Sequence, residues 1–330
     1  MHEFPDHKRF AFTIFDDTDR STVENVSPVY QLLSDLGMHT TKSVWPLASV
    51  REGWHGGSSL QDAYYLEFIL ELKSRGYEIG LHNVRNHHST RQQIVSGLDT
   101  FRQLVGHYPR VHANHSRNRE NIYWGESRFN TLRSMYRAAT ALGRKRVFEG
   151  EDPDAEYFWG DLCRQRVDYV RNFVFRQINL DHINPTLPYH DPTRPYVKHW
   201  FSSCEGANVN SFCDMVSERN QERLEEEGGV CIMYTHFACG FVNGGAVGGR
   251  VRELLRALSK RNGWFVPVSQ LLDHLRNERG DSPISAAEIS CMERRWVLDK
   301  MTMCAKEALH VHPEIDVPVL KDSHAQLYQR

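Results

Sequence analysis

Short apolar segments alternate with amphipathic helical segments along most of this chain, and this alternation constrains its fold more than any other feature. Apolar segments at residues 10–15, 43–46, 77–82 and 110–114 are each followed by a helical pattern, and segments at 229–236 and 263–268 continue the series. Strands joined through helices run parallel, with right-handed crossovers. We therefore predict an α/β fold, a distorted (β/α) barrel of about seven strands.

Two parts of the chain do not follow this alternation. Residues 144–210 are poorly periodic and rich in proline, tyrosine, histidine and arginine, with a helix-like stretch at 161–175. We predict that they form an insertion that closes over the site. A helix and a polar, extended segment are predicted for the end of the chain. The expected organisation is a barrel domain at 1–279, with the insertion inside it, and a C-terminal helix and tail at 280–330.

Composition excludes several classes of protein. The 330 residues carry a formal net charge of −2, which provides no basic field for a nucleic acid or an anionic membrane. No apolar run approaches the roughly 18 residues that span a bilayer, and no signal-like region is evident, so we expect a cytoplasmic protein. None of the seven cysteines stands in a CxxC pair. The 18 histidines, in contrast, favour a metal site.

Carboxylates and imidazoles follow four of the predicted strands. Asp16, Asp17, His82, the segment 112–115 and His236 occupy these positions, and the loops after the strands form the active site of a (β/α) barrel. Adjacent aspartates can supply a metal ligand and a proton acceptor, and carboxylate with imidazole suits a catalytic zinc. His236 is a candidate general acid. A solvated acidic turn and structural histidines are the alternatives.

The segment at residues 112–125 (HANHSRNRENIYWG) concentrates polar and aromatic side chains. Such side chains bind sugar hydroxyls, carboxylates or phosphates, and aromatic rings offer stacking faces. We predict substrate contacts from His112, Asn114, Asn118, Arg119, Tyr123 and Trp124. A structural polar loop is the alternative.

Four segments, in order, resemble motifs of the polysaccharide deacetylase family. They are residues 12–18 (FTIFDDT), 76–82 (GYEIGLH), 234–236 (YTH) and 263–272 (GWFVPVSQLL), and the resemblance covers about residues 8–276. It implies a distorted (β/α) barrel that removes N-acetyl groups from sugars with a divalent metal ion, for which the carboxylate and imidazole ligands favour zinc. It further implies that Asp16 is the base, that Asp17 and His82 bind the metal, and that His236 protonates the leaving amine.

The chain departs from the family pattern after His82. The family has a second metal-binding histidine four positions later, where this chain has Asn86. We therefore predict His115 as the third ligand, with His87 as the alternative if the loop bulges. Thr18 replaces the usual glycine, and the segment at 112–125 replaces the arginine–proline motif. These departures indicate a divergent subfamily.

The predicted function is metal-dependent hydrolysis of an N-acetyl group, at a carbon–nitrogen bond that is not a peptide bond. In the cytoplasm the substrate would be an acetylated sugar or a sugar-containing biosynthetic intermediate, for example of a surface polysaccharide. Two alternatives stay open. One is a metal-dependent amidohydrolase for a substrate that is not a sugar, and the other is a non-catalytic carbohydrate-binding barrel, suggested by Asn86. The sequence leaves the oligomeric state open.

Overall fold

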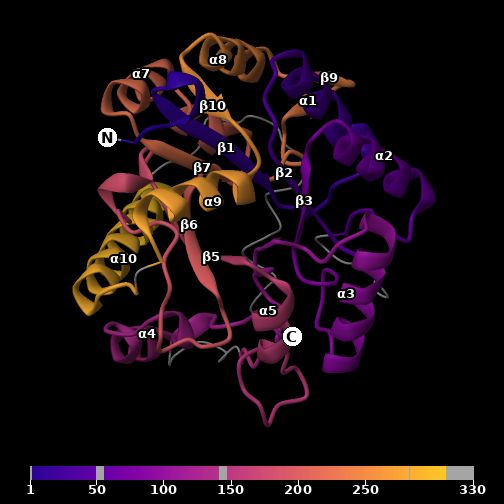
Figure 1. Cartoon of the computed structure of the whole chain (residues 1–330), viewed down its shortest axis with the longest axis vertical. Helices are drawn as coiled ribbons and strands as arrows, with labels where there is room; N and C mark the ends of the chain where they lie inside the picture. The colour runs from indigo at the N-terminus through magenta and orange to yellow at the C-terminus, as the bar shows by residue number, and fades with distance from the viewer. Residues whose placement is uncertain (1, 50–55, 141–146, 282, 310–330) are drawn as a thin grey trace.

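A closed barrel of seven parallel strands forms the centre of the computed structural model (Figure 1). Strands β1 to β7 follow one another in order around the barrel, and pairing of β1 with β7 closes it. An eighth strand, β10, pairs with the first residues of β1. The structure describes residues 2–49, 56–140, 147–281 and 283–309, with side chains up to residue 302. The predicted (β/α) barrel is confirmed.

The strands are β1 (Phe10–Asp16), β2 (Thr41–Val44), β3 (Glu78–Leu81), β4 (Val111–His112), β5 (Tyr169–Phe175), β6 (His199–Glu205), β7 (Val230–Thr235) and β10 (Gly263–Phe265), with a hairpin of β8 (Val242–Asn243) and β9 (Ala246–Val247). The helices are α1 (Val23–Asp35), α2 (Ala63–Ser74), α3 (Arg91–Val105), α4 (Arg133–Thr140), α5 (Gly160–Arg166), α6 (Val209–Met215), α7 (Glu218–Glu227), α8 (Gly249–Ser259), α9 (Val268–Arg279) and α10 (Ala286–Leu309). Short 3-10 turns lie at Pro5–His7, Gly125–Arg128 and Leu180–His182. No helix of the described ranges is long and apolar enough to cross a membrane.

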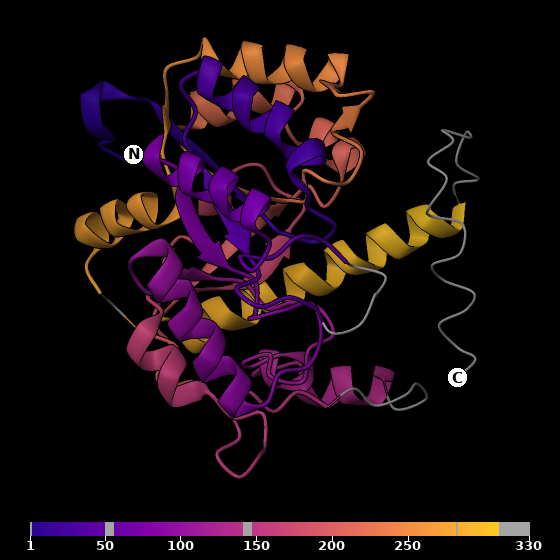
Figure 2. The same cartoon turned by 90° about the vertical axis from the view of Figure 1, so that its right-hand side faces the viewer.

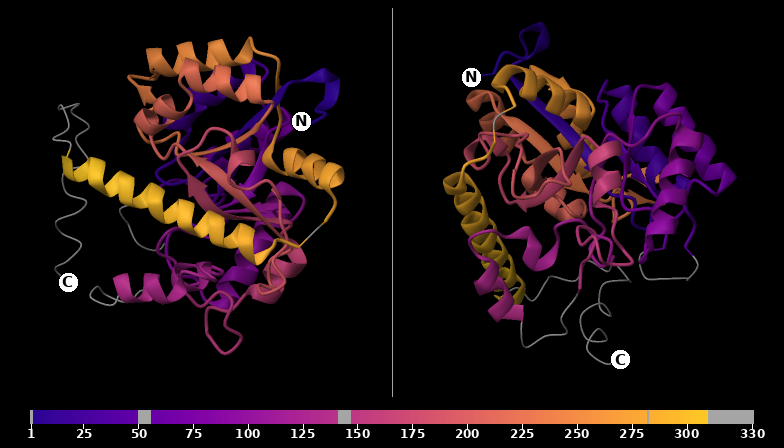
Figure 3. Two further views of the ribbon diagram at one scale, coloured as in Figure 1. Left: turned by 90° about the vertical axis from the view of Figure 1, so that its left-hand side faces the viewer. Right: turned by 60° about the horizontal axis from the view of Figure 1, so that its bottom comes forward.

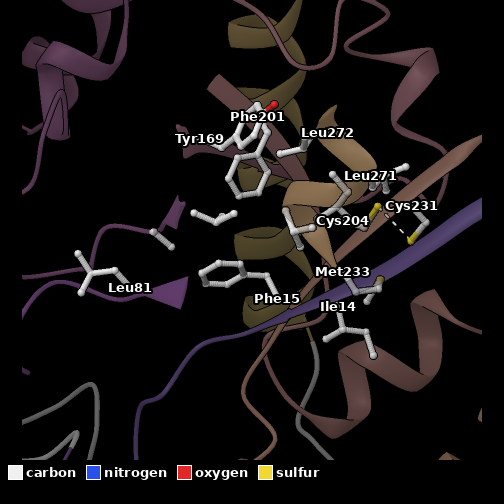
Figure 4. Close-up of a cluster of buried hydrophobic side chains, with 14 of the residues drawn as sticks. Ile14, Phe15, Leu81, Tyr169, Phe201, Cys204, Cys231, Met233, Leu271 and Leu272 are labelled. Carbon is white, nitrogen blue, oxygen red and sulfur yellow. Dashed lines mark hydrogen bonds between the residues drawn. The ribbon is translucent and has the colours of Figure 1, made fainter. Parts of the chain in front are cut away.

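Strand β1 is buried on both of its faces, as expected for a barrel strand covered by helices. The ring of Phe15 lies 6.4 Å from that of Phe201 on β6, and a Cβ atom at Gly80 on β3 would lie 3.2 Å from it. Neither β3 nor β6 is a neighbour of β1 in the sheet, so Phe15 points into the barrel (Figure 4). Successive strand residues point to opposite faces, and this alternation decides the direction of the aspartates that follow.

The middle of the chain differs from the prediction. Residues 144–210 contain the barrel strands β5 and β6, and the stretch predicted as a helix at 161–175 is α5 followed by β5. A short run rich in aromatic and β-branched residues fits a buried strand as well as a buried helical face, and periodicity alone does not separate the two. The segment is therefore part of the barrel wall.

Helix α10 lies along the outside of the barrel beside β5, and its C-terminal end extends beyond the body of the protein (Figure 2 and Figure 3). Its Glu293 is fully buried and accepts hydrogen bonds from three backbone N–H groups, those of Asn130, Thr131 and Leu132, just before α4. The hydroxyl of Thr131 donates to the same carboxylate at 2.6 Å. Glu293 therefore caps α4 from another helix.

Replacing Glu293 with alanine should lower the free energy of unfolding by about 2 kcal/mol, because the α4 N-terminus loses its acceptors. Urea denaturation measures this loss. Glu67→Ala is the control, since Glu67 is exposed and lies in the interior of α2, away from a helix N-terminus. Equal losses in both variants would contradict a capping role for Glu293.

Candidate active site

Three imidazoles from three strand ends converge on the carboxylate of Asp19, which lies three residues beyond the end of β1. Nε2 of His115 lies 2.8 Å from Oδ1 of Asp19. Nε2 of His82 and Nε2 of His236 lie 3.2 Å and 3.0 Å from Oδ2. His82 follows β3, His115 follows β4 and His236 follows β7. The convergence of strand-end residues predicted from the sequence is therefore present, but its centre is Asp19.

The other ring nitrogen of each histidine faces an oxygen acceptor. The acceptors of Nδ1 are the carbonyl oxygen of Ala113 at 2.9 Å for His82, the carbonyl oxygen of Ala207 at 2.7 Å for His236, and Oδ1 of Asn118 at 3.0 Å for His115. Because these oxygens can only accept, each Nδ1 carries a proton. In the neutral tautomer, Nε2 then presents a lone pair to Asp19.

The Nε2 lone pairs of three neutral imidazoles would repel the carboxylate of Asp19 unless protons or a metal ion lay between them. Protons on Nε2 can remove this repulsion. Burial alone would lower the pKa of His236, but the hydrogen bond and charge of Asp19 raise it to about 9. The pKa of His115 is raised against burial in the same way. Burial would raise the pKa of Asp19, but His115 and its neighbours hold that pKa well below its usual range.

A divalent metal ion can take the place of these protons. Asp19, His82 and His115 offer one ligand atom each, all within 4.8 Å of one another, and Asp17, Asp19 and His236 form a second such group. One carboxylate and two imidazoles form a ligand set typical of a catalytic zinc with an open position. Hydrogen bonds from Nδ1 to oxygen acceptors are the usual support of metal-binding histidines. The residues present therefore fit a divalent metal.

Asp17 also points to the inside of the barrel, where it pairs with Arg171 of β5. The guanidinium donates to both carboxylate oxygens, at 2.9 Å and 2.5 Å. Oδ2 of Asp17 lies 3.8 Å from Nε2 of His82, beside the cluster. Burial would raise the pKa of Asp17, but Arg171 lowers it below its ordinary value. Asp17 is therefore ionised and held in one orientation next to the cluster.

Asp16 points away from this cluster, toward helix α1. It is fully buried, and it accepts hydrogen bonds at 2.9 Å from the hydroxyl of Tyr30 and from the backbone N–H of Phe237. Nζ of Lys42 lies 2.9 Å from Oδ2. The alternation along β1 gives this direction, because Phe15 and Asp17 face inward. This geometry does not fit the prediction that Asp16 is the catalytic base, since its carboxylate is fully buried, faces away from the cluster and is engaged by Tyr30, Lys42 and Phe237.

Access to the cluster is greatest at His236. Its side chain is 14% exposed, whereas those of Asp17, Asp19, His82 and His115 are between 2% and 9% exposed. The rings of Tyr234 and His236 lie 5.2 Å apart, and the guanidinium of Arg171 lies 4.5 Å above the Tyr234 ring. The most accessible side of the cluster is therefore the side of β7.

Comparison with known proteins supports the fold. No family model matches the sequence, and no curated protein is similar to it. Among solved structures, a probable polysaccharide deacetylase from Pseudomonas aeruginosa PAO1 aligns over 85% of this chain and 95% of its own, with 11% identity and a TM-score of 0.50. The chain has the polysaccharide deacetylase fold. Two further structures align at lower scores: Puue allantoinase (12% identity, 85% and 94% of the chains, TM-score 0.49) and the peptidoglycan deacetylase PdaC from Bacillus subtilis (14%, 89% and 99%, 0.39).

Within this polysaccharide deacetylase fold, the loop after β3 does not bring His87 into the cluster. The backbone oxygen of His87 accepts a hydrogen bond from Nδ2 of Asn118 at 3.1 Å, and neither potential metal-binding group among the described residues includes His87. Asn83, with a φ of 56°, turns the chain directly after His82, and its Oδ1 accepts the backbone N–H of His115 at 2.8 Å. The geometry therefore favours His115 over His87 as the third ligand.

The six residues predicted to bind substrate fall into two groups in the deacetylase fold. His112, Asn114, Asn118 and Tyr123 are buried, whereas Arg119 and Trp124 are partly exposed. The amide of Asn114 accepts from the N–H of Ile122 and donates to its carbonyl, both at 3.0 Å, and so braces the loop. Asn114 therefore supports the loop, and substrate contact stays a prediction for the four buried residues. Substrate contact stays a prediction for Arg119, which pairs with Glu149, and for Trp124, which lies over Arg128.

His112 should make the stability of the protein sensitive to acid. It is fully buried, its Nε2 lies 3.2 Å from Oδ1 of Asn114, and burial lowers its pKa from 6.5 to about 3. The folded state therefore binds fewer protons than the unfolded state between these values, so stability falls as the pH drops below 6.5. Between pH 7 and pH 5 this residue should cost about 2 kcal/mol.

Urea denaturation at both pH values tests this expectation. His112→Gln should reduce the loss between pH 7 and pH 5 by about 2 kcal/mol relative to the wild type. The exposed His107 provides the control, His107→Gln, which should lose stability as the wild type does. A pH dependence that His112→Gln leaves unchanged would show that another group is responsible.

Proposed function

We propose that this chain is a metal-dependent hydrolase that removes an acetyl group from the nitrogen of a sugar or of a polysaccharide precursor. The observation that carries the proposal is the set of three imidazoles whose Nε2 atoms face Asp19 while each Nδ1 is engaged by an oxygen. Asp19, His82 and His115 would hold a divalent ion, for which zinc is the first candidate.

The residues around the ion have complementary roles in this proposal. A divalent ion supplies a Lewis acid that polarises a carbonyl group and lowers the pKa of a water molecule. Asp17, held by Arg171, accepts the proton of the water that attacks the acetyl carbon. His236, fixed through Nδ1 on Ala207, donates a proton from Nε2 to the nitrogen as the carbon–nitrogen bond breaks. Acetate and a free amine are the products.

The sugar part of the proposal is supported by the fold and by the sequence motifs. The solved structure that matches at a TM-score of 0.50 is described as a probable polysaccharide deacetylase. The motif resemblance points to the same substrates. An acetylated sugar, or a sugar-containing biosynthetic intermediate met in the cytoplasm, is therefore the substrate class that we propose.

Elemental analysis combined with a substrate panel tests the proposal. The purified protein should contain roughly one zinc ion per chain, lose stability and turnover with EDTA, and release amine from N-acetylated sugars in preference to simple acetamides. Turnover of simple amides alone would establish the amidohydrolase alternative. Absence of stoichiometric metal, together with no effect of EDTA on stability, would establish a non-catalytic binding barrel.

A further inference from the structure

The segment that carries Asp17 and Asp19 is also buried on the side that faces away from the histidine cluster. Asp17 and Asp19 face the cluster, while the side chains of Asp16, Thr18 and Ser21 contact groups outside the barrel and are fully buried. Oγ1 of Thr18 lies 3.2 Å from the hydroxyl of Tyr65 on α2. The metal-facing segment is therefore held from behind by groups that the proposed chemistry does not use.

A buried ion pair lies at the centre of these contacts. Nζ of Lys42, on β2, lies 2.9 Å from Oδ2 of Asp16 and donates to Oγ of Ser21 at 2.9 Å. The hydroxyl of Tyr30 donates to the same Asp16 oxygen at 2.9 Å. Both side chains of the pair are fully buried. A buried ion pair is weak evidence for stability, because apolar side chains of similar size often stabilise a protein equally well. Stability therefore does not by itself explain why these two charged residues are buried here.

The contacts fix both ends of the turn that carries Asp19. The N–H of Ser21 donates to the carbonyl oxygen of Thr18 at 3.0 Å, which closes a turn over Asp19 and Arg20. Arg20 has a φ of 60°, a conformation that non-glycine residues adopt only under constraint. Lys42 holds Ser21 at one end, and Tyr65 holds Thr18 at the other. The position of Asp19 therefore depends on contacts behind the turn.

The ion pair also reaches the strand that carries the third imidazole. Oδ1 of Asp16 accepts the backbone N–H of Phe237 at 2.9 Å, directly after His236. In the register of the sheet, Asp16 lies opposite Lys42 of β2 on one side and opposite Thr235 of β7 on the other. One carboxylate thus connects the turn that carries Asp19 with the end of β7.

We propose that Asp16 and Lys42 are positioning residues that set the places of Asp19 and His236 and thereby the metal affinity of the cluster. This inference rests on the metal site proposed above. Outer residues that orient metal ligands typically contribute 10- to 100-fold in metal affinity. The ion pair is such an outer group for the ligand Asp19, and it also positions the proposed proton donor His236.

The test is the double variant Asp16→Asn with Lys42→Met, which removes both charges and retains the shapes of the side chains. Competition with a chromophoric chelator measures the affinity for Zn²⁺, and hydrogen exchange reports on the backbone at residues 17–21 and 236–237. We expect a cooperative fold, a Zn²⁺ affinity about 10- to 100-fold lower, and faster exchange confined to these two segments.

A matched control removes a buried ion pair elsewhere. Arg194 and Asp191 are buried and 2.5 Å apart, and neither contacts Asp19 or the three histidines. Asp191→Asn with Arg194→Met should leave the Zn²⁺ affinity and the exchange of the two segments unchanged. If the Asp16 and Lys42 double variant does not fold, Tyr30→Phe, which removes the hydroxyl that donates to Asp16, should still lower the Zn²⁺ affinity.

The outcomes separate this inference from the proposed function. Wild-type Zn²⁺ affinity in the folded double variant, or in Tyr30→Phe, would overturn the positioning role and leave the metal site standing. A wild-type protein that binds no Zn²⁺ would refute the metal site. The exchange data then decide the positioning role: faster exchange at the two segments alone supports it, and a uniform rise or no rise overturns it.

Discussion

Replacing Asp19 with asparagine should lower the affinity for Zn²⁺ by more than about 100-fold, because the loss of a direct ligand exceeds the 10- to 100-fold typical of outer residues. Hydrolysis should fall below detection at the same time. The carboxylate contacts all three imidazoles. Isothermal titration with Zn²⁺ on metal-free protein gives the affinity directly.

Asp17→Asn is the variant that separates the two assignments of the acidic residues. The motif resemblance implies Asp17 as the metal ligand, and one of the two potential metal-binding groups contains Asp17, with Asp19 and His236. Both carboxylate oxygens of Asp17, however, accept hydrogen bonds from Arg171, whereas Asp19 contacts all three histidines. Asp17→Asn should therefore retain most of the Zn²⁺ affinity and lose turnover. Loss of Zn²⁺ binding in Asp17→Asn, with binding retained in Asp19→Asn, would restore the assignment implied by the resemblance.

Replacing Arg171 with methionine should lower the free energy of unfolding at pH 7 by about 3–5 kcal/mol, the typical cost of leaving one member of a buried ion pair alone. Asp17 and Arg171 are both nearly inaccessible to solvent, and the pair is bidentate. Guanidinium denaturation followed by circular dichroism measures the change.

The pH dependence of this variant follows from the same pair. In the wild type Arg171 lowers the pKa of Asp17, so the stability from the pair is present above the ordinary value of 3.8 and is lost as the pH falls through the folded pKa. Without Arg171, burial raises that pKa, so the deficit of the variant should grow as the pH rises from 4 to 7. Asp17→Asn should rescue most of the stability of Arg171→Met. A deficit that is constant with pH would contradict this account.

The barrel was predictable because its strands are buried on both faces and read as short apolar runs between helices. Strands β1, β3 and β7 follow this pattern, and the polar residues after them, including His82 and His236, were recognised for that reason. Strand β5 (YVRNFVF) was not recognised. Its Arg171 interrupts the apolar run, because this side chain serves Asp17 inside the barrel.

The roles of the three aspartates could not be read from the sequence. Asp16, Asp17 and Asp19 lie within four residues, and only the direction of β1 in the barrel separates them. The side of the strand that Phe15 occupies sets Asp16 outside and Asp17 inside, and the turn closed by Ser21 brings Asp19 back to the cluster. The signal available in the sequence was the third acidic residue itself, which the motif resemblance does not use.

The sequence also did not indicate that several polar residues of the segment at 112–125 are buried. Asparagine and histidine in a loop serve as substrate ligands or as internal braces, and the residue types are the same in both cases. Asn118 shows the difference, because its Oδ1 accepts from His115 while its amide nitrogen donates to the backbone oxygens of Arg85 and His87. These partners come from another loop, and the sequence does not indicate which loops meet.

The most direct test of the metal site is a crystal of the protein grown with Zn²⁺ and measured on both sides of the zinc absorption edge. We expect a single strong anomalous peak bounded by Oδ of Asp19 and Nε2 of His82 and His115, at bond lengths of about 2.0–2.2 Å. Nδ1 of each histidine should keep its oxygen acceptor. A cluster without an anomalous peak, with the hydrogen bonds from Asp19 to the imidazoles intact, or a peak at Asp16 or His87, would contradict the account.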